Sequence, residues 1–365
     1  MSSVLGKLWV CSILMLIVIS IFGAKAEMNF DYKVSDEGYA LIEYVVTDEG
    51  YARIKGCIST DPDRKELVLP SVVDGYTVIA LDSLHGNGDP LPYKRLVIPD
   101  SYTEITQNGF YGAWYLEAVS LPASLEKLEG NPFFAEDYSM MAQLKEIQIS
   151  PRNKAFKVED GCLIDVAEQK LIAAANRDHF ELPEVRIIGE AAFYENQQIK
   201  RIRIPDTVEL IEEYAFVGCE NLQNVVFSKN LKQINAMAFG RCTSLMEVSI
   251  PETVLRIRSS AFASCTALKS VTLPEGLEEI DWYLFDGCSA LTTIHLPENV
   301  QRILIGAFQD CTSLQEIWIP ETVTEIDSIA FLHCDQLTAR VYPSSYAEKY
   351  CSEKGIKYEY RNGKQ

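Results

Sequence analysis

The sequence predicts an α/β solenoid, an elongated stack of short coils with a parallel β-sheet along one face. Two observations point to this fold: a fixed period of 23 residues, and one short apolar strand pattern in each period. A single coil of this length cannot bury its apolar side, whereas stacked coils share a core. The period is clearest in a column of phenylalanines, each 23 residues from the next: Phe193, Phe216, Phe239, Phe262, Phe285, Phe308 and Phe331.

A second column keeps the register of the phenylalanines. A cysteine stands three residues after each phenylalanine from Phe216 onward, and Asn196 takes this position in the coil of Phe193. Because the register holds over so many coils, we expect equivalent side chains to stack above one another along the solenoid. The cysteines of this column are Cys219, Cys242, Cys265, Cys288, Cys311 and Cys334.

The coil that leads to Phe285 illustrates the expected local structure. Val271 and Leu273 are placed to face inward from a short strand, with Thr272 between them facing outward. Pro274 ends the strand because proline cannot donate to a sheet ladder. The chain then returns toward Phe285, and we expect a short helical or 3₁₀ segment on the side opposite the sheet.

The repeats divide the chain into four segments. We expect about nine to ten coils over residues 67–343, interrupted by a β-hairpin insertion at about residues 156–176. A terminal coil would expose its core to water, so both ends need caps. Residues 27–66 are predicted to form an N-terminal β cap, and residues 344–365 a C-terminal cap of a helix and a strand. Residues 1–26 precede the fold.

Two similar tripeptides occur in the N-terminal cap, Asp36-Glu37-Gly38 and Asp48-Glu49-Gly50. Each places a glycine where a turn between strands is expected. A calcium site is the alternative, although this spacing provides no loop with the five or six oxygen ligands that calcium requires.

The repeat unit resembles a known family. Its pattern, Val-x-x-Ile-x-x-x-Ala-Phe-x-x-Cys-x-x-Leu-x-x-Val-x-Leu-Pro, is similar to the BspA-type, or treponemal-type, leucine-rich repeat, and the similarity runs from about Leu67 to Pro343. The resemblance implies a leucine-rich-repeat solenoid shaped as a right-handed arc, in a family that is commonly exported. Its members include surface adhesins and binding proteins. This sequence shows neither the additional domains nor the wall signal that often accompany adhesin members.

Residues 1–26 have the pattern of a signal peptide. Lys7 precedes the apolar run Val10–Phe22, and Ala24-Lys25-Ala26 follows as a cleavage site of small residues. A retained membrane helix is the alternative, but it requires about 20 apolar residues, which is longer than this run. We therefore expect cleavage near Ala26–Glu27, secretion or residence in the cell envelope, and no stable membrane insertion afterwards.

The charge of the chain excludes one class of partner. The chain has 52 acidic and 33 basic residues, a net charge of −19, which becomes −21 when the leader is removed with Lys7 and Lys25. Nucleic-acid binding depends on basic residues that neutralise phosphates. A nucleic-acid partner is therefore not expected.

Nine cysteines remain after cleavage, an odd number that argues against a fully paired disulfide framework. We expect the six cysteines of the column to be free thiols packed in the core, because cysteine behaves as a small apolar residue there. Disulfides between neighbouring coils and a metal ladder are the alternatives. Cys57, Cys162 and Cys351 are isolated in sequence. Two of them could form a disulfide, but the sequence does not indicate which two.

Catalytic motifs are absent from the sequence. The four histidines, His85, His179, His295 and His333, belong to no metal-binding motif, and there is no nucleophile elbow or phosphate-binding glycine loop. We therefore expect no enzyme activity, no cofactor and no metal. The predicted function is recognition of a protein or glycan partner. The alternatives are a passive structural or spacer protein of the cell envelope and, less favoured, a polysaccharide or peptide hydrolase.

The outward strand positions are the predicted binding surface. They form one stripe along the stack, in which Trp318 beside His295 is the expected anchor. Shielding of the sheet by Trp318 is the alternative. Arg203, with Arg201 two residues earlier, is placed either to bind an acidic group or to pair with neighbouring glutamates. Along the chain the stripe comprises Val97, Ser120, Gln148, Arg203, Val226, Ser249, Thr272, His295, Trp318 and Val341.

Overall fold

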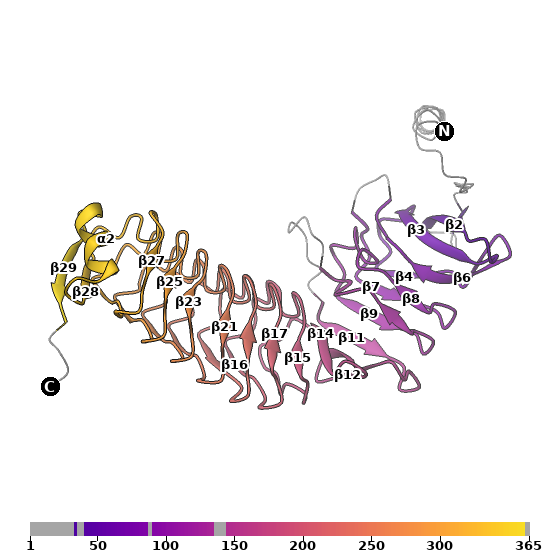
Figure 1. Cartoon of the computed structure of the whole chain (residues 1–365). Helices are drawn as coiled ribbons and strands as arrows, with labels where there is room; N and C mark the ends of the chain where they lie inside the picture. Colours follow the sequence, from indigo (N-terminus) through magenta and orange to yellow (C-terminus); the bar gives the residue numbers. More distant parts are fainter. Residues whose placement is uncertain (1–32, 35–39, 87–89, 135–143, 362–365) are drawn as a thin grey trace, which may run out of the picture.

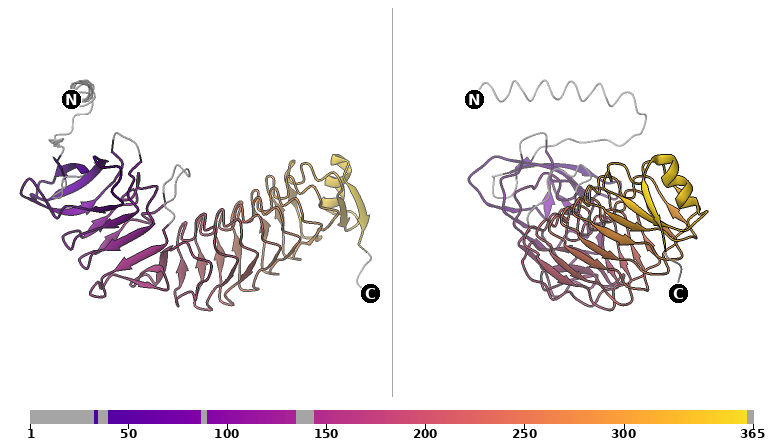
Figure 2. Two further views of the ribbon diagram at one scale, coloured as in Figure 1. Left: turned by 180° about the vertical axis from the view of Figure 1, so that it is seen from behind. Right: turned by 90° about the vertical axis from the view of Figure 1, so that its left-hand side faces the viewer.

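The computed structural model describes residues 33–34, 40–86, 90–134 and 144–361. The predicted leader, its cleavage site and the first Asp-Glu-Gly tripeptide lie outside these residues. The described chain forms an elongated arc with a cap at each end (Figure 1). Figure 2 shows the same arc from two further directions. This confirms the predicted solenoid.

One parallel sheet, called here the first sheet, contains the strands that the repeat pattern predicts. Most of the three-residue strands have two outward residues and one buried residue, as in Arg201–Arg203, where Ile202 is buried. The first sheet has two parts. The N-terminal part contains β4 Glu66–Val68, β7 Arg95–Val97, β9 Ala118–Leu121 and β11 Glu146–Ile149. The C-terminal part contains β16 Arg201–Arg203, β18 Asn224–Val226, β20 Glu247–Ser249, β22 Ser270–Thr272, β24 Thr293–His295, β26 Glu316–Trp318, β28 Thr338–Val341 and β29 Lys357–Tyr360.

A second parallel sheet takes the place of the expected helical segments. Most of its strands have two residues, an outward one followed by a buried isoleucine or leucine. The strands of this sheet are β6 Tyr76–Leu81, β8 Glu104–Ile105, β10 Lys127–Leu128, β14 Lys170–Ala174, β15 Ile187–Ile188, β17 Leu210–Ile211, β19 Gln233–Ile234, β21 Arg256–Ile257, β23 Glu279–Ile280, β25 Arg302–Ile303 and β27 Glu325–Ile326. They pair in register from coil to coil within three groups, β6 to β10, β14 to β21 and β23 to β27.

The backbone of the turn after each short strand explains why no helix forms there. Two positions in each regular coil have a positive φ, for example 57° at Ser260 and 58° at Ser264. A right-handed helix cannot continue through such residues. The two positions recur from coil to coil, and glycine takes some of them, as at Gly287 with φ 69°. The turn region therefore consists of tight turns, so this part of the sequence-based expectation was wrong.

The buried phenylalanines form a continuous stack along the C-terminal coils. Rings of successive coils are nearly parallel, with centroids 4.8 Å apart for Phe193 and Phe216 and 5.9 Å apart for Phe262 and Phe285. Phe262 is fully buried. A shorter stack joins Phe110 and Phe133 in the N-terminal part, 4.5 Å apart. Each ring thus covers the next, so every coil depends on its neighbours to bury its core.

The predicted hairpin insertion separates two apolar cores. Its strands β12 Phe156–Glu159, β13 Cys162–Asp165 and β14 form an antiparallel sheet, and β14 then pairs in parallel with β15. Alternate side chains of β13 point to opposite faces. Leu163 packs into the N-terminal core, while Cys162 and Ile164 pack into the C-terminal core. The sequence predicted one continuous core, whereas the insertion divides it in two.

The N-terminal cap closes one end of the stack. Its strands β1 Lys33–Val34, β2 Ala40–Val46 and β3 Ala52–Ser59 are antiparallel, and β3 pairs in parallel with β6. A two-residue strand, β5 Val72–Val73, pairs with β6 as well. Gly50, with φ 83°, lies in the turn between β2 and β3, where the second Asp-Glu-Gly tripeptide predicts a turn.

The C-terminal cap contains the expected helix and strand. Helix α2 Tyr346–Lys354 begins after Ser345, whose hydroxyl accepts a hydrogen bond from the backbone N–H of Glu348, and it ends before Gly355. Strand β29 then pairs with β28. The solenoid has about 13 turns, more than the nine to ten expected. Coils of irregular length near the insertion and a cap strand that extends the sheet do not show the regular period, so the sequence pattern undercounts them.

We predict that truncating one ring of the phenylalanine stack destabilises the protein strongly. Phe262→Ala leaves a cavity between two coils, so the free energy of unfolding should fall by about 3–5 kcal/mol. Urea unfolding followed by circular dichroism measures the change. Met246→Ala is the control, because Met246 is 44% exposed and its truncation should change stability by less than about 0.5 kcal/mol. A loss below about 1 kcal/mol for Phe262→Ala would contradict the stacking account.

A second prediction concerns the turn backbone. Gly287→Ala should lower the free energy of unfolding by about 1–2 kcal/mol, because alanine is strained at a φ of 69°. The added Cβ would lie no closer than 3.5 Å to its neighbours, so backbone strain is the cause rather than a clash. Ser264→Gly, one coil earlier at the equivalent position, should raise stability by up to about 1 kcal/mol. Equal effects of the two substitutions would contradict this account.

Candidate functional site

The predicted binding residues lie on the first sheet, on strands β16 to β26. Within this part the register aligns them in pairs: Arg203 with Val226, Ser249 with Thr272, and His295 with Trp318. We call the six residues of these pairs the outward column. Arg203, Val226, Ser249, Thr272 and His295 are exposed, whereas Trp318 is half-buried.

The stripe is not continuous along the whole stack. Strand β11 with Gln148 and strand β16 with Arg203 belong to the two separate parts of the first sheet and do not pair, because the insertion and an irregular coil lie between them. At the other end, Arg340 rather than Val341 aligns with Trp318, and Val341 is fully buried. This last coil is one residue shorter than the regular period, and a shift of one residue exchanges the two faces of a strand.

Trp318 lies within a cluster at the C-terminal end of the sheet. The imidazole of His295 stacks on the indole, with ring centroids 4.8 Å apart. The guanidinium of Arg361 lies 5.3 Å from the centroid of the Trp318 ring and 4.7 Å from that of Tyr342. Arg361 also forms an ion pair with Glu298 at 3.1 Å. Trp318 therefore exposes only part of its indole to solvent, and it also shields the end of the sheet.

The sequence reasoning missed the charged side chains around Trp318, of which Arg361 lies over its ring. Arg340 forms ion pairs with Glu316 and Glu359, which lie on the strands on either side of it. Arg361 reaches Trp318 from the residue after β29. No periodic signal marks Glu359 and Arg361, because they belong to the cap, and Arg340 lies in the last coil, which is one residue shorter than the period. Their one signal is the concentration of aromatic and charged residues at the end of the chain.

The other end of the outward column has a different character. Arg201 and Arg203 project from β16, and within the described residues neither forms an ion pair. Hydrogen bonds from Lys229, together with the charges of Lys229 and Arg203, lower the pKa of Asp206, so one carboxylate lies in the neighbourhood of Arg203. The Val226 side chain beside Arg203 is 45% exposed. In the described part of the chain, these arginines therefore do not form the ion pairs with neighbouring glutamates that were one of the two possibilities. Their guanidinium groups are free to bind an external acidic group.

The six cysteines of the column are free, buried thiols, each bound to the coil before it. The Sγ atom of Cys265 donates a hydrogen bond to the carbonyl oxygen of Phe239 at 3.2 Å, and the other five cysteines make the same contact at 3.0–3.2 Å. Burial raises the pKa of the Cys265 thiol to about 12. The column therefore joins coils through thiol donors rather than disulfides.

The isolated cysteines are free as well. Cys57, Cys162 and Cys351 are buried without disulfide bonds, and burial raises the pKa of the Cys57 thiol to about 12. Among the described residues, no group of three or more His, Cys, Asp or Glu side chains has an arrangement that could hold a metal ion.

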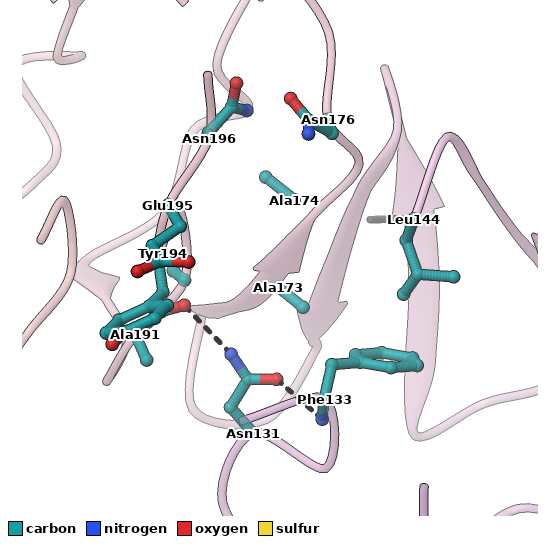
Figure 3. A pocket seen from close by; sticks show the side chains of 11 residues that line it. Asn131, Phe133, Leu144, Ala173, Ala174, Asn176, Ala191, Tyr194, Glu195 and Asn196 are labelled. Carbon is teal, nitrogen blue, oxygen red and sulfur yellow. Dashed lines mark hydrogen bonds between the residues drawn. The ribbon is translucent and has the colours of Figure 1, made fainter. Parts of the chain in front are cut away.

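A small cavity lies where the two cores meet (Figure 3). Asn131 Nδ2 donates to the carbonyl oxygen of Ala191 at 3.1 Å, and its Oδ1 accepts from the backbone N–H of Phe133. Asn176 and Asn196 also line the cavity, which has a volume of about 40 Å³. This is room for a few water molecules only. We therefore assign the cavity to the joint between the two parts of the solenoid and not to ligand binding.

Comparison with known families identifies the repeats. A family model described as the BspA type leucine rich repeat region matches in six copies, over residues 91–162, 170–267 and 238–351. No curated protein matches the chain. Within the described residues, no helix is both long and apolar enough to span a membrane.

Several solved structures resemble the solenoid. A leucine-rich repeat protein from Eubacterium ventriosum matches with a TM-score of 0.55 and 19% sequence identity, over 86% of this chain and 91% of that one. A leucine rich cell surface protein from Faecalibacterium prausnitzii matches with a TM-score of 0.45 and 21% identity, over 84% and 94% of the two chains. A leucine rich repeat protein from T. pallidum matches with a TM-score of 0.41 and 19% identity, over 90% and 98%.

The buried thiols predict a specific dependence of stability on pH. The pKa of the Cys265 thiol is about 12 in the folded protein, above the ordinary value of 9.0. The contribution of this thiol to the free energy of unfolding is therefore complete below pH 9 and is lost as the pH rises toward 12. At pH 7.5, Cys265→Ala should lower the free energy of unfolding by about 1–2 kcal/mol, because a buried contact and a hydrogen bond are lost.

Above pH 9 this difference should shrink by about 1.4 kcal/mol per pH unit, because the unfolded wild-type chain gains a thiolate that the variant lacks. Urea unfolding at several pH values measures both proteins. Met246→Ala is the control and should differ from wild type by the same amount at each pH. If the difference in free energy of unfolding between wild type and Cys265→Ala stays constant with pH, the account of a buried thiol with a raised pKa is wrong.

Proposed function

From the premise that this chain belongs to the BspA-type leucine-rich repeat family, we propose that it is an exported, non-enzymatic recognition protein. It binds an acidic protein partner through the first sheet, at the outward column and Arg201. The observation that supports this most is the pair Arg201 and Arg203, which have no ion-pair partner among the described residues of a chain with net charge −19.

Charge explains why this pair is informative. Two other arginines on the first sheet are paired: Arg95 with Glu146 at 2.7 Å, and Arg340 with Glu316 and Glu359. A guanidinium left unpaired beside an exposed Val226 offers a partner both charge complementarity and apolar contact. Arginine is also enriched at the centres of protein interfaces.

The shape of the face favours a protein over a small molecule. Eight strands spaced about 4.8 Å apart present an extended pleated surface from β16 to β29. Ser249 and Thr272 are small and polar at its centre, and His295 with the exposed part of Trp318 lies toward the far end. An extended surface with charge at one end and aromatic groups at the other suits a large, complementary partner.

Export completes the proposal. Lys7, the apolar run Val10–Phe22 and the small residues before Glu27 support translocation and cleavage. Sequencing the N-terminus of the exported protein should give Glu27 as its first residue.

The test is a binding screen followed by charge reversal. The exported chain is screened against extracellular matrix proteins, envelope proteins and glycans, and hits are measured by biolayer interferometry. The double variant Arg201→Glu/Arg203→Glu should weaken binding of a protein hit at least tenfold, because attraction to acidic groups becomes repulsion. Trp318→Ala should have a smaller effect, because Arg361 covers part of the ring.

Lys232→Glu is the matched control. Lys232 is exposed beside the second sheet, and its reversal should leave affinity within about twofold of wild type. Equal losses of affinity for the control and the double variant would show that the effect depends only on net charge, and they would refute the proposed site. A screen without any partner would favour the passive spacer of the cell envelope.

A further inference from the structure

An open pocket lies on the second sheet, away from the outward column. Its volume is about 540 Å³, and its lining comes from the coils of β17 through β25. Trp282 stands at this pocket with 53% of its surface exposed. The equivalent positions in the two preceding coils hold the small residues Ser259 and Ala236, so the indole borders a hollow instead of a row of large side chains.

Fixed polar groups line one side of this hollow. Gln233 Nε2 donates to Asn235 Oδ1 at 2.5 Å, and Asn235 Nδ2 donates to Glu213 Oε1 at 3.0 Å. This relay joins two neighbouring coils and sets the orientation of each amide. The groups are therefore arranged before a ligand arrives, which lowers the entropic cost of binding.

Charged groups complete the lining beside the tryptophan. Asp281 is only 8% exposed, and its carboxylate accepts a hydrogen bond from the backbone N–H of Trp282 at 2.6 Å. Arg302 pairs with Glu279. Arg258 is exposed and lines the same pocket, and in the described part of the chain its guanidinium forms no ion pair or hydrogen bond.

We propose that this pocket is a binding site for a neutral saccharide. The indole of Trp282 offers a flat apolar surface for the C–H face of a sugar ring. Asp281 is placed to accept a hydrogen bond from a sugar hydroxyl group, and Arg258 is placed to donate one to an adjacent hydroxyl group. The Gln233–Asn235 relay offers further hydrogen bonds from its amides. An apolar platform with a few oriented polar groups is the arrangement that fixes a small polar ligand.

The lining distinguishes a neutral sugar from other ligand classes. Three carboxylates, Glu213, Glu279 and Asp281, face two guanidinium groups, Arg258 and Arg302. The pocket therefore has no positive excess to attract a phosphate or an acidic sugar. Its many polar groups likewise disfavour a lipid, which would leave them without hydrogen-bond partners.

This site is independent of the proposed protein-binding face. Trp282 follows β23 of the second sheet, whereas Trp318 ends β26 of the first sheet. The recognition protein would thus have two surfaces, one for a protein and one for a glycan. Either can fail in experiment without affecting the other.

The test uses the exported chain and a panel of soluble neutral oligosaccharides of glucose, galactose, mannose and N-acetylglucosamine. Isothermal titration calorimetry measures affinity, and tryptophan fluorescence reports contact with the indole. Binding of at least one oligosaccharide is expected. Trp282→Ala should weaken it at least tenfold, and Asp281→Asn and Arg258→Ala at least threefold each, because each loses a platform or a hydrogen-bonding group.

The matched control is Tyr115→Ala, which removes an aromatic side chain that is 59% exposed and lies outside the pocket and the outward column. It should leave saccharide affinity within twofold of wild type, and Trp282→Phe should retain part of the binding. All of these substitutions lie at the surface or conserve shape, so circular dichroism should be unchanged. Failure of every oligosaccharide to bind, or binding that survives Trp282→Ala, overturns the proposal.

Discussion

Contact between successive coils is the constraint on which the structure depends. No coil encloses a core of its own, so each must bury its apolar side against the next. The phenylalanine stack provides one continuous part of this contact, and each thiol of the cysteine column adds a hydrogen bond to the carbonyl of the preceding coil, as Cys288 does to Phe262 at 3.2 Å. Because equivalent atoms must meet in every coil, the same residue types recur at the same positions, which gives the sequence its period.

The insertion between the two parts modifies this simple arrangement. Strand β13 sends Leu163 to one core and Ile164 to the other, so a single sheet closes both. Strand β14 then starts the second sheet of the C-terminal coils. The insertion thus acts as an internal cap that also continues the stack. This explains how the two parts can have separate cores while remaining one molecule.

Function in such a molecule is separated from stability. The inward positions are held by stacking and tolerate little variation, whereas the outward positions are free to differ from coil to coil. On this acidic solenoid, the unpaired Arg201 and Arg203 stand out on one sheet and the exposed Trp282 on the other. Neither surface requires a change in the fold. Recognition can therefore evolve by substitution at outward positions alone.

The sequence alone was sufficient to predict the solenoid, the strands of the first sheet and the caps, because inward residues repeat wherever coils stack. Buried, free cysteines followed from the same regularity. The second sheet could not be predicted, since its strands have two residues and their turns depend on positive φ angles at residues such as Ser260, which composition does not reveal. The proposed binding surfaces were the least accessible to sequence reasoning. Trp318 was recognised by its column, but Arg361, which lies over its ring, comes from the cap and follows no period. Trp282 was missed because its position varies from coil to coil, and its exposure depends on the small side chains of Ser259 and Ala236 in neighbouring coils. The period thus determined what is buried. Contacts between different coils decided what is exposed, because they join residues that no local pattern relates.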